Sequence, residues 1–175
     1  MESKYFCEIC GTKPDQLSHH KAHLQTQKHA ENCEIFKKDM GIFSTVFRQW
    51  RAEGTHCKYL HGYAVSFRVW FEGDLDEKNW VWDFGGMKRA VGKIDGMNPK
   101  EWMNWLLDHT TIIAEDDPYL EKFKQMHEDG IIQLRILPSV GAERFAEYLF
   151  KKIDEFVQDE THYRVRVSKV EVFEH

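Results

Sequence analysis

The residues that most clearly suggest chemistry are those at positions 56–63, in the sequence His-Cys-Lys-Tyr-Leu-His-Gly-Tyr. This stretch places the thiol of Cys57 four residues before the imidazole of His61. A deprotonated thiol acts as a nucleophile or a base, and an imidazole transfers protons or holds a metal ion. The pattern therefore predicts one site that contains both a reactive thiol and a metal ligand.

Titratable residues that could take part in the same chemistry occur at two later places in the chain. Asp108 and His109 follow the apolar run 102–107, and Glu174 ends the sequence Val-Glu-Val-Phe-Glu. A carboxylate beside a histidine can orient the imidazole for proton transfer. We therefore count Asp108 and His109 as a candidate catalytic pair, and Glu174 as a candidate ligand-binding carboxylate.

Each of these residues also has a purely structural interpretation. Cys57 can be a small buried hydrophobic residue, and His61 can hydrogen-bond a turn carbonyl. Asp108 can cap a turn, and His109 can favour the end of a helix through the helix dipole. Glu174 can be an ordinary exposed residue near the end of the chain. The order in which the motifs occur argues for function more strongly than any one of them.

In that order, Cys-x-x-x-His-Gly, Asp-Phe-Gly, Leu-Asp-His and the final Val-Glu-Val-Phe-Glu resemble the 6-pyruvoyl- and 6-carboxytetrahydropterin synthase (QueD) family. The resemblance covers residues 42–175. It implies an α+β tunnelling fold, in which an antiparallel sheet carries helices on one face. It also implies a homo-oligomer built from trimers, with active sites between subunits.

The resemblance assigns a role to each candidate residue. Cys57 would act on the side chain of 7,8-dihydroneopterin triphosphate, with Asp108 and His109 assisting. His61 would be one catalytic zinc ligand, and Glu174 would anchor the pterin ring. The implied activity is a 6-carboxytetrahydropterin synthase-like lyase in a 7-deazaguanine pathway of the queuosine type.

The sequence departs from the family at the catalytic metal. Where the family has His-x-His, this chain has His61 and then Tyr63, and Phe47 stands at the position of the upstream ligand. Catalytic zinc normally takes three protein ligands. His56 or Tyr63 would have to complete the set, so we expect weak zinc binding or none. A pterin- or purine-binding homologue without catalysis is therefore an alternative function.

The first part of the chain carries a separate metal-binding pattern. Cys7 and Cys10 are followed by His23 and His29, with gaps of two, twelve and five residues. This spacing is typical of a two-Cys, two-His zinc finger, in which the four side chains hold Zn²⁺ in a tetrahedron. A disulfide between Cys7 and Cys10 is the alternative, but a reducing compartment disfavours it.

This pattern predicts two domains, a zinc finger over residues 1–38 and the pterin-synthase-like domain over residues 42–175. Residues 1–35 hold four lysines, five acidic residues and no arginine. Nucleic-acid binding usually needs Lys or Arg on phosphates, so binding through the finger is possible but not favoured. A zinc-finger adaptor that contacts protein or nucleic acid is the third function considered.

Composition sets the remaining limits. The chain has 175 residues, 42% of them hydrophobic, and a formal net charge of −5. This is enough apolar material for one ordinary domain, and the charge argues against a broadly basic surface. No apolar run has the length of a membrane span. We therefore expect a cytoplasmic protein with no membrane partner.

Periodicity and turn residues place the structural elements. The helix of the finger is expected to continue through residues 34–38. Beyond it we expect strands at 42–51, 63–72, 131–137 and 163–173, and helices at 86–93, 99–107, 119–128 and 141–158.

Overall fold

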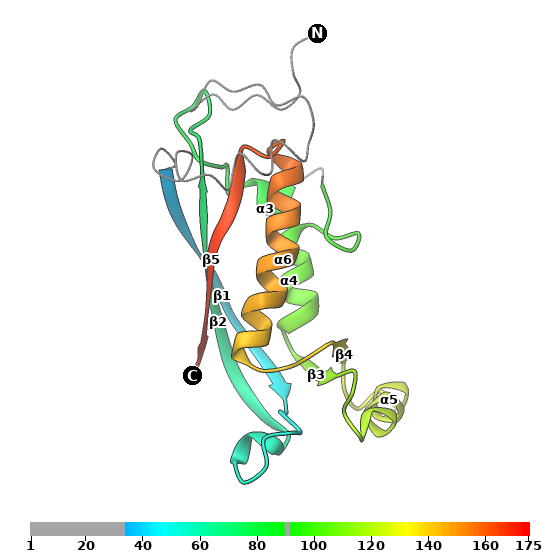
Figure 1. Cartoon of the computed structure of the whole chain (residues 1–175). Coiled ribbons are helices and arrows are strands. Elements are labelled where there is room, and N and C mark those ends of the chain that lie inside the picture. The colour runs from blue at the N-terminus through cyan, green and yellow to red at the C-terminus, as the bar shows by residue number, and fades with distance from the viewer. Residues whose placement is uncertain (1–33, 90–91) are drawn as a thin grey trace. The chain divides into compact units, whose positions relative to one another are not determined.

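The computed structural model describes residues 34–89 and 92–175, so the four predicted finger ligands Cys7, Cys10, His23 and His29 lie outside the described residues. Figure 1 shows the elements along the chain. They are β1 Glu34–Phe47, the 3₁₀ helix η1 His56–Lys58, β2 His61–Gly73, α3 Gly86–Arg89, α4 Pro99–Leu107, β3 Thr110–Ala114, α5 Leu120–Glu128, β4 Leu134–Leu137, α6 Ala142–Glu160 and β5 Val165–Glu174.

The strands form one sheet in the order β4-β3-β1-β2-β5. The last residue, His175, donates its N–H to the carbonyl of Ala64 at 2.9 Å, whereas Gly73 lies against the backbone at Val165. Strands β2 and β5 are therefore antiparallel. Strand β3 instead pairs in parallel with both β1 and β4. The expectation of an antiparallel sheet is thus wrong for β3 and β4, because the helix α5 between them provides the crossover that parallel strands require.

The chain divides into two compact units. The described part of the first comprises residues 34–38, Val69–Pro99 without its two undescribed residues, and Phe150–Lys169. The second comprises Asp39–Arg68, Lys100–Leu149 and Val170–His175. All the candidate catalytic and pterin-binding residues belong to the second unit.

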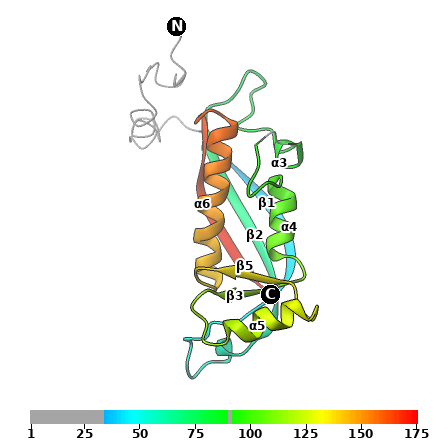
Figure 2. The ribbon, with the colours of Figure 1, turned by 90° about the vertical axis from the view of Figure 1, so that its right-hand side faces the viewer.

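Aromatic side chains build the core of the second unit. Phe47 of β1 and Phe145 of α6 are buried and meet edge to face, with ring centroids 5.0 Å apart. Trp102 of α4, which is fully buried, stacks on Tyr148 of α6 at 6.1 Å. Helices α4 and α6 therefore lie side by side, and Figure 2 shows them on the same side of the sheet.

In the first unit, the second half of α6 packs its apolar face on the loop after β2. Phe156 meets Trp82 at 6.0 Å, and Trp82 meets Phe71 of β2 at 5.1 Å. Because α6 places apolar residues at helical spacing, one face is continuously buried. None of the helices in the described ranges is long and apolar enough to cross a membrane.

Most elements lie where periodicity places them, but the strand expected at 42–51 is β1, which ends at Phe47, and two other expectations differ more. The helices predicted at 99–107 and 141–158 are α4 and α6, and the strands predicted at 63–72 and 163–173 are β2 and β5. The helix predicted at 34–38 is wrong, because these residues begin β1, where pairing in the sheet outweighs local preference. Strand β3 was not predicted, since it is buried on both faces and shows no alternation.

One buried ion pair fixes the end of β1 to the loop after β3. The Nε of Arg48 donates to Oδ2 of Asp117 at 2.8 Å, and the side chain of Asp117 is 0% exposed. Asp117 also accepts the N–H of Tyr119 at 2.8 Å. The neighbouring pair between Arg51 and Asp116 is solvent-exposed, at 2.6 Å.

We expect Asp117→Ala to lower the free energy of unfolding by about 3 kcal/mol, because it leaves the guanidinium of Arg48 without its buried partner. Asp116→Ala, the matched control, should cost less than about 1 kcal/mol. Urea denaturation of the two variants measures the difference. Equal losses would contradict a structural role for the buried pair.

Candidate functional site

Tyr63 is the centre of a group of side chains from four segments of the second unit. Its ring stacks on Phe47 of β1 with centroids 4.0 Å apart and planes 13° apart. The ring of His61, also on β2, lies 4.5 Å from it. Burial and the charges of Cys57 on η1 and Glu174 on β5 raise the pKa of the Tyr63 hydroxyl. We refer to Phe47, Cys57, His61, Tyr63 and Glu174 as the Tyr63 cluster.

The electrostatics of Tyr63 report what surrounds its hydroxyl. Burial raises the pKa of Tyr63 above its ordinary value, and the negative charges of Cys57 and Glu174 at alkaline pH raise it further. The thiol and the carboxylate therefore both lie within electrostatic range of one phenol. Like any tyrosine, Tyr63 is protonated at neutral pH and can donate a hydrogen bond, and the raised pKa extends its protonated range to more alkaline pH.

Local backbone contacts position the thiol. Thr55 caps the 3₁₀ helix, and its hydroxyl accepts the N–H of Cys57 at 3.3 Å. The N–H of Gln49, just after β1, donates to the carbonyl of Cys57 at 2.8 Å. These bonds hold the turn against the end of β1, and Cys57 itself is a free, half-buried cysteine.

The end of β5 positions the carboxylate. His175 donates its N–H to Ala64, and its Nε2 lies 3.0 Å from the hydroxyl of Ser66. Both contacts hold the end of β5 against the start of β2, next to Tyr63. Glu174 is exposed in the single chain, so a bound ligand can reach its oxygens.

The residues at the expected catalytic metal positions do not fit a zinc ion. Nδ1 of His61 lies 2.7 Å from the carbonyl of Tyr59, which leaves Nε2 as the one ring nitrogen of His61 that could ligate a metal, and a single ligand does not make a zinc site. Phe47 has no lone pair to donate, and its ring is stacked face to face on Tyr63. The ring of His56 is exposed. Within 34–89 and 92–175, no three His, Cys, Asp or Glu residues are placed to share a metal ion.

Asp108 and His109 form a pair of their own between α4 and β3. Nδ1 of His109 lies 3.2 Å from Oδ1 of Asp108, and the His109 side chain is 76% exposed. The same carboxylate oxygen accepts the N–H of Ser44 at 3.3 Å, and Ser44 accepts the N–H of His109 at 2.6 Å. His109 has a φ of 56°, which turns the chain from the helix into the strand. Its ring lines a cavity of about 670 Å³ together with His127.

The structure brings Cys57, His61 and Glu174 together, but it leaves Asp108 and His109 elsewhere on the same chain. The pair contacts Ser44, whereas Cys57 contacts Gln49, five residues further along the chain. At about 3.3 Å per residue, these two points on the chain can lie up to roughly 16 Å apart. We therefore treat the candidate residues of one chain as two groups.

Sequence reasoning treated Phe47 and Tyr63 as lost or improvised ligands and missed that their rings stack. A signal was present, because Phe47 lies within one expected strand, 42–51, and Tyr63 begins the next. It also missed Arg48 and Asp117, whose pairing depends on the unpredicted strand β3. No local pattern joins residues so far apart in the sequence.

The α+β fold with this arrangement of helices on a five-stranded sheet defines a known class of protein. Residues 37–175 match the family model described as 6-pyruvoyl tetrahydropterin synthase. The chain therefore belongs to the 6-pyruvoyl tetrahydropterin synthase family.

One relative in sequence is a Pyrococcus horikoshii protein described as "Putative 6-carboxy-5,6,7,8-tetrahydropterin synthase", which is 29% identical over 101 residues. The match spans 57% of this chain and 60% of that relative. In structure, an uncharacterised Wolinella succinogenes protein has a TM-score of 0.64 at 18% identity, over 81% of this chain and 92% of that one. The 6-pyruvoyltetrahydropterin synthase of Plasmodium vivax has a TM-score of 0.51 at 15% identity, over 82% and 98%. These two likenesses show the fold.

The Tyr63 cluster predicts that removing the charge of Glu174 changes the pKa of Tyr63. Glu174→Gln should lower the pKa of Tyr63, because the phenolate then forms without a neighbouring negative charge. NMR of ¹³C-labelled tyrosine during alkaline titration, with Tyr63→Phe for assignment, measures the shift. Glu171→Gln on the same strand is the control and should leave the titration unchanged. An unchanged pKa in Glu174→Gln would contradict the proximity of the two side chains.

Proposed function

We propose that this chain is a 6-carboxytetrahydropterin synthase-like lyase that acts on 7,8-dihydroneopterin triphosphate in a 7-deazaguanine pathway of the queuosine type. The observation that carries the proposal is the Tyr63 cluster, in which Cys57 and Glu174 lie within electrostatic range of the same phenol. Family membership over residues 37–175 supports it, as does the name of the Pyrococcus relative. A small phosphorylated substrate also makes the cytoplasm the proposed location.

In this proposal, three residues of the Tyr63 cluster have separate roles in the reaction. Glu174 accepts hydrogen bonds from the amino and amide groups of the pterin ring and so fixes its orientation. The thiolate of Cys57 takes a proton from the substrate side chain as general base. The protonated hydroxyl of Tyr63 donates a hydrogen bond to negative charge that develops on the side-chain oxygens.

No step of this scheme passes through a catalytic metal. The aromatic stack of Phe47 and Tyr63 stands where the family resemblance places two zinc ligands. Polarisation of the substrate oxygens then rests on the Tyr63 hydroxyl, which is a weaker device than a divalent ion. We therefore expect slower turnover than a complete zinc site would give.

Asp108 and His109 enter the scheme through a second copy of the chain. In one chain they contact Ser44, away from Cys57. We propose a symmetric homo-oligomer built from trimers, in which the pair of one subunit completes the site of its neighbour. His109 then relays the proton, and Asp108 orients its ring.

A second function has one specific observation in its favour. Because Phe47 and Tyr63 replace ligands, the chain can be a pterin- or purine-binding homologue that retains the ring pocket and no longer catalyses the reaction. Glu174 would serve both functions equally, since it holds the ring and takes no part in proton transfer. Turnover distinguishes the two.

We propose a structural zinc for Cys7, Cys10, His23 and His29, in a finger that makes contacts of its own. Residues 1–35 carry four lysines against five acidic residues, so a protein contact is better supported than nucleic acid. An adaptor role for the whole chain would give no reason for a thiol and a carboxylate around Tyr63.

Incubation with 7,8-dihydroneopterin triphosphate should release triphosphate and form a 6-substituted tetrahydropterin, as followed by mass spectrometry. Cys57→Ala should slow this reaction by about 10²- to 10⁴-fold, because it removes the general base. Pterin binding, measured by calorimetry, should persist in that variant. Lys58→Ala, in the same turn, is the control and should keep its activity.

Absence of turnover by the wild-type chain at enzyme concentrations equal to substrate, with zinc added, would refute the lyase. Retained pterin binding in that case would establish the second function. A mixture of inactive Cys57→Ala and His109→Ala chains should recover about a quarter of the wild-type rate after subunit exchange, because one site in four then pairs two intact groups. No recovery would contradict the shared site.

Metal content tests the two metal proposals together. After dialysis against a mild chelator, elemental analysis should find close to one zinc per chain, held by the finger, whose folding is coupled to the metal. Cys7→Ser should remove it, whereas Cys57→Ser, the matched thiol control, should leave it in place. Two tightly held zinc ions would contradict our interpretation of Phe47 and Tyr63.

A further inference from the structure

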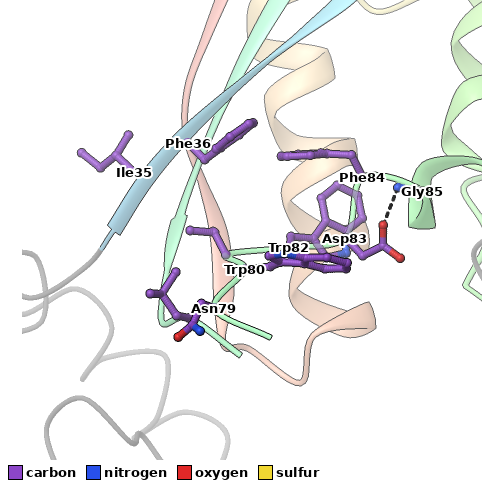
Figure 3. A pocket seen from close by; sticks show the side chains of 10 residues that line it. Ile35, Phe36, Asn79, Trp80, Trp82, Asp83, Phe84 and Gly85 are labelled. Carbon is purple, nitrogen blue, oxygen red and sulfur yellow. Dashed lines mark hydrogen bonds between the residues drawn. The ribbon is translucent and has the colours of Figure 1, made fainter. Parts of the chain in front are cut away.

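A second cavity lies in the first unit, between the start of β1 and the loop that follows β2. Its volume is about 450 Å³, and it is lined by Ile35, Phe36, Leu75 and residues 79–85. Figure 3 shows aromatic side chains on several of its walls, among them Phe36, Trp82 and Phe84. The rings of Phe36 and Phe84 meet at 4.7 Å. We call this cavity the Trp80 pocket.

Large apolar side chains at the Trp80 pocket are left open to solvent. Ile35 is 64% exposed, Phe36 46%, Leu75 41% and Trp80 47%. Single exposed apolar residues are common, but several around one hollow usually mark an interaction site. The pocket is therefore a surface that another group can cover.

The loop that presents Trp80 is fixed by hydrogen bonds. Oδ1 of Asp76 accepts the N–H of Lys78 at 2.8 Å and that of Trp80 at 3.0 Å. The hydrogen bond from the N–H of Trp80 is the largest influence on the Asp76 carboxyl, and it lowers the pKa of that group. The guanidinium of Arg164 donates to the carbonyl of Val81 at 2.8 Å and also to that of Asp74. Trp80 is thus held in its exposed position before any ligand arrives.

The lining is better suited to apolar side chains than to a phosphorylated metabolite. None of its residues is basic, and its only charged side chain is Asp83. Oδ1 of Asp83 accepts the N–H of Gly85 at 2.8 Å, which Figure 3 marks as a dashed line. No member of the Tyr63 cluster lines the pocket. Its occupant therefore differs in kind from the proposed pterin substrate.

We propose that the Trp80 pocket is the docking site of residues 1–33 of the same chain. This segment joins β1 at Glu34, and the next two residues, Ile35 and Phe36, already line the pocket. A covalent tether of this kind gives an effective concentration in about the millimolar range. Even a weak apolar contact is then mostly occupied.

The composition of residues 1–33 supports this occupant. The segment contains the apolar residues Phe6, Leu17 and Leu24, and it has too few residues to bury a large core of its own. Leu24 stands eleven residues before Ile35, and an extended chain of that length reaches at most about 36 Å. Insertion of its apolar side chains between Trp80 and Phe36 would bury apolar surface that the pocket leaves open. Docking would hold the predicted finger against the pterin-synthase domain as a fixed module.

Photo-crosslinking of the full chain tests the proposal. The aromatic photo-crosslinker p-benzoylphenylalanine replaces Trp80, so the bulk of the side chain is kept, and crosslinked peptides are mapped by mass spectrometry. Light and heavy isotope-labelled chains are mixed to separate links within a chain from links between chains. The control places the same group at Trp105, which is 45% exposed. The two tryptophans are matched in their surroundings, because Lys78 lies over the ring of Trp80 and Arg135 over that of Trp105.

We expect position 80 to crosslink to residues 1–33 within the same chain, and position 105 not to do so. Links mainly between light and heavy chains would show that a second copy covers the pocket and would overturn the proposal. Absence of links from position 80 to residues 1–33 would overturn it as well.

A second measurement uses simple substitutions. If the segment docks on Trp80, Trp80→Ala should speed cleavage after Glu31 by a glutamate-specific protease at least about fivefold, because Glu31 lies beyond the last proposed finger ligand and its cleavage follows the population of the undocked form. Trp105→Ala should leave that rate unchanged. Equal rates in the wild type and in Trp80→Ala, with the far-UV circular dichroism of both preserved, would overturn the docking proposal.

Discussion

The pairing of β1 with its two neighbours is the constraint on which the candidate chemistry depends. On one side, β1 sets Phe47 against Tyr63 of β2, and on the other it sets Ser44 against Asp108 and His109. Just past its end, Gln49 holds the turn that carries Cys57, and Arg48 pairs with the buried Asp117. Because strand pairing fixes position to within one residue, a slip of β1 would disturb both groups of candidate residues together.

The Tyr63 cluster shows how a family site changes character when its ligands change. A ring nitrogen attracts a cation, whereas a phenyl ring excludes both the cation and its water. Stacked rings at 4.0 Å make an apolar wall there, and the Tyr63 hydroxyl is a hydrogen-bond donor in the same cluster. That phenol is protonated at neutral pH like any tyrosine, and burial and two neighbouring acidic groups extend its protonated range to higher pH. Stabilisation of negative charge therefore passes, in our proposal, from a metal ion to a neutral donor.

The two groups of candidate residues also explain why assembly matters to the proposed reaction. Asp108 and His109 have the geometry of an oriented acid-base pair, but His109 faces solvent and lies away from the thiol of its own chain. Because the His109 side chain is 76% exposed, few neighbouring groups of the same chain surround it that could hold a substrate in place. A neighbouring subunit would supply both the missing thiol and the exclusion of water. In this proposal, function is a property of the assembly, while the single chain supplies the parts.

The sequence by itself determined the helices α4 and α6 and the strands β2 and β5, because their signals come from residues a few positions apart. The ordered motifs also indicated the family, which the match over residues 37–175 confirms, whereas the roles of Cys57 and Glu174 stay predictions. Only the tertiary structure decided that residues 34–38 extend β1, that β3 pairs in parallel, and that Phe47 stacks on Tyr63. The parallel pair of Thr45 and Thr110 joins residues 65 positions apart. Contacts of that range depend on the packing of the whole sheet, which no local pattern of residues encodes.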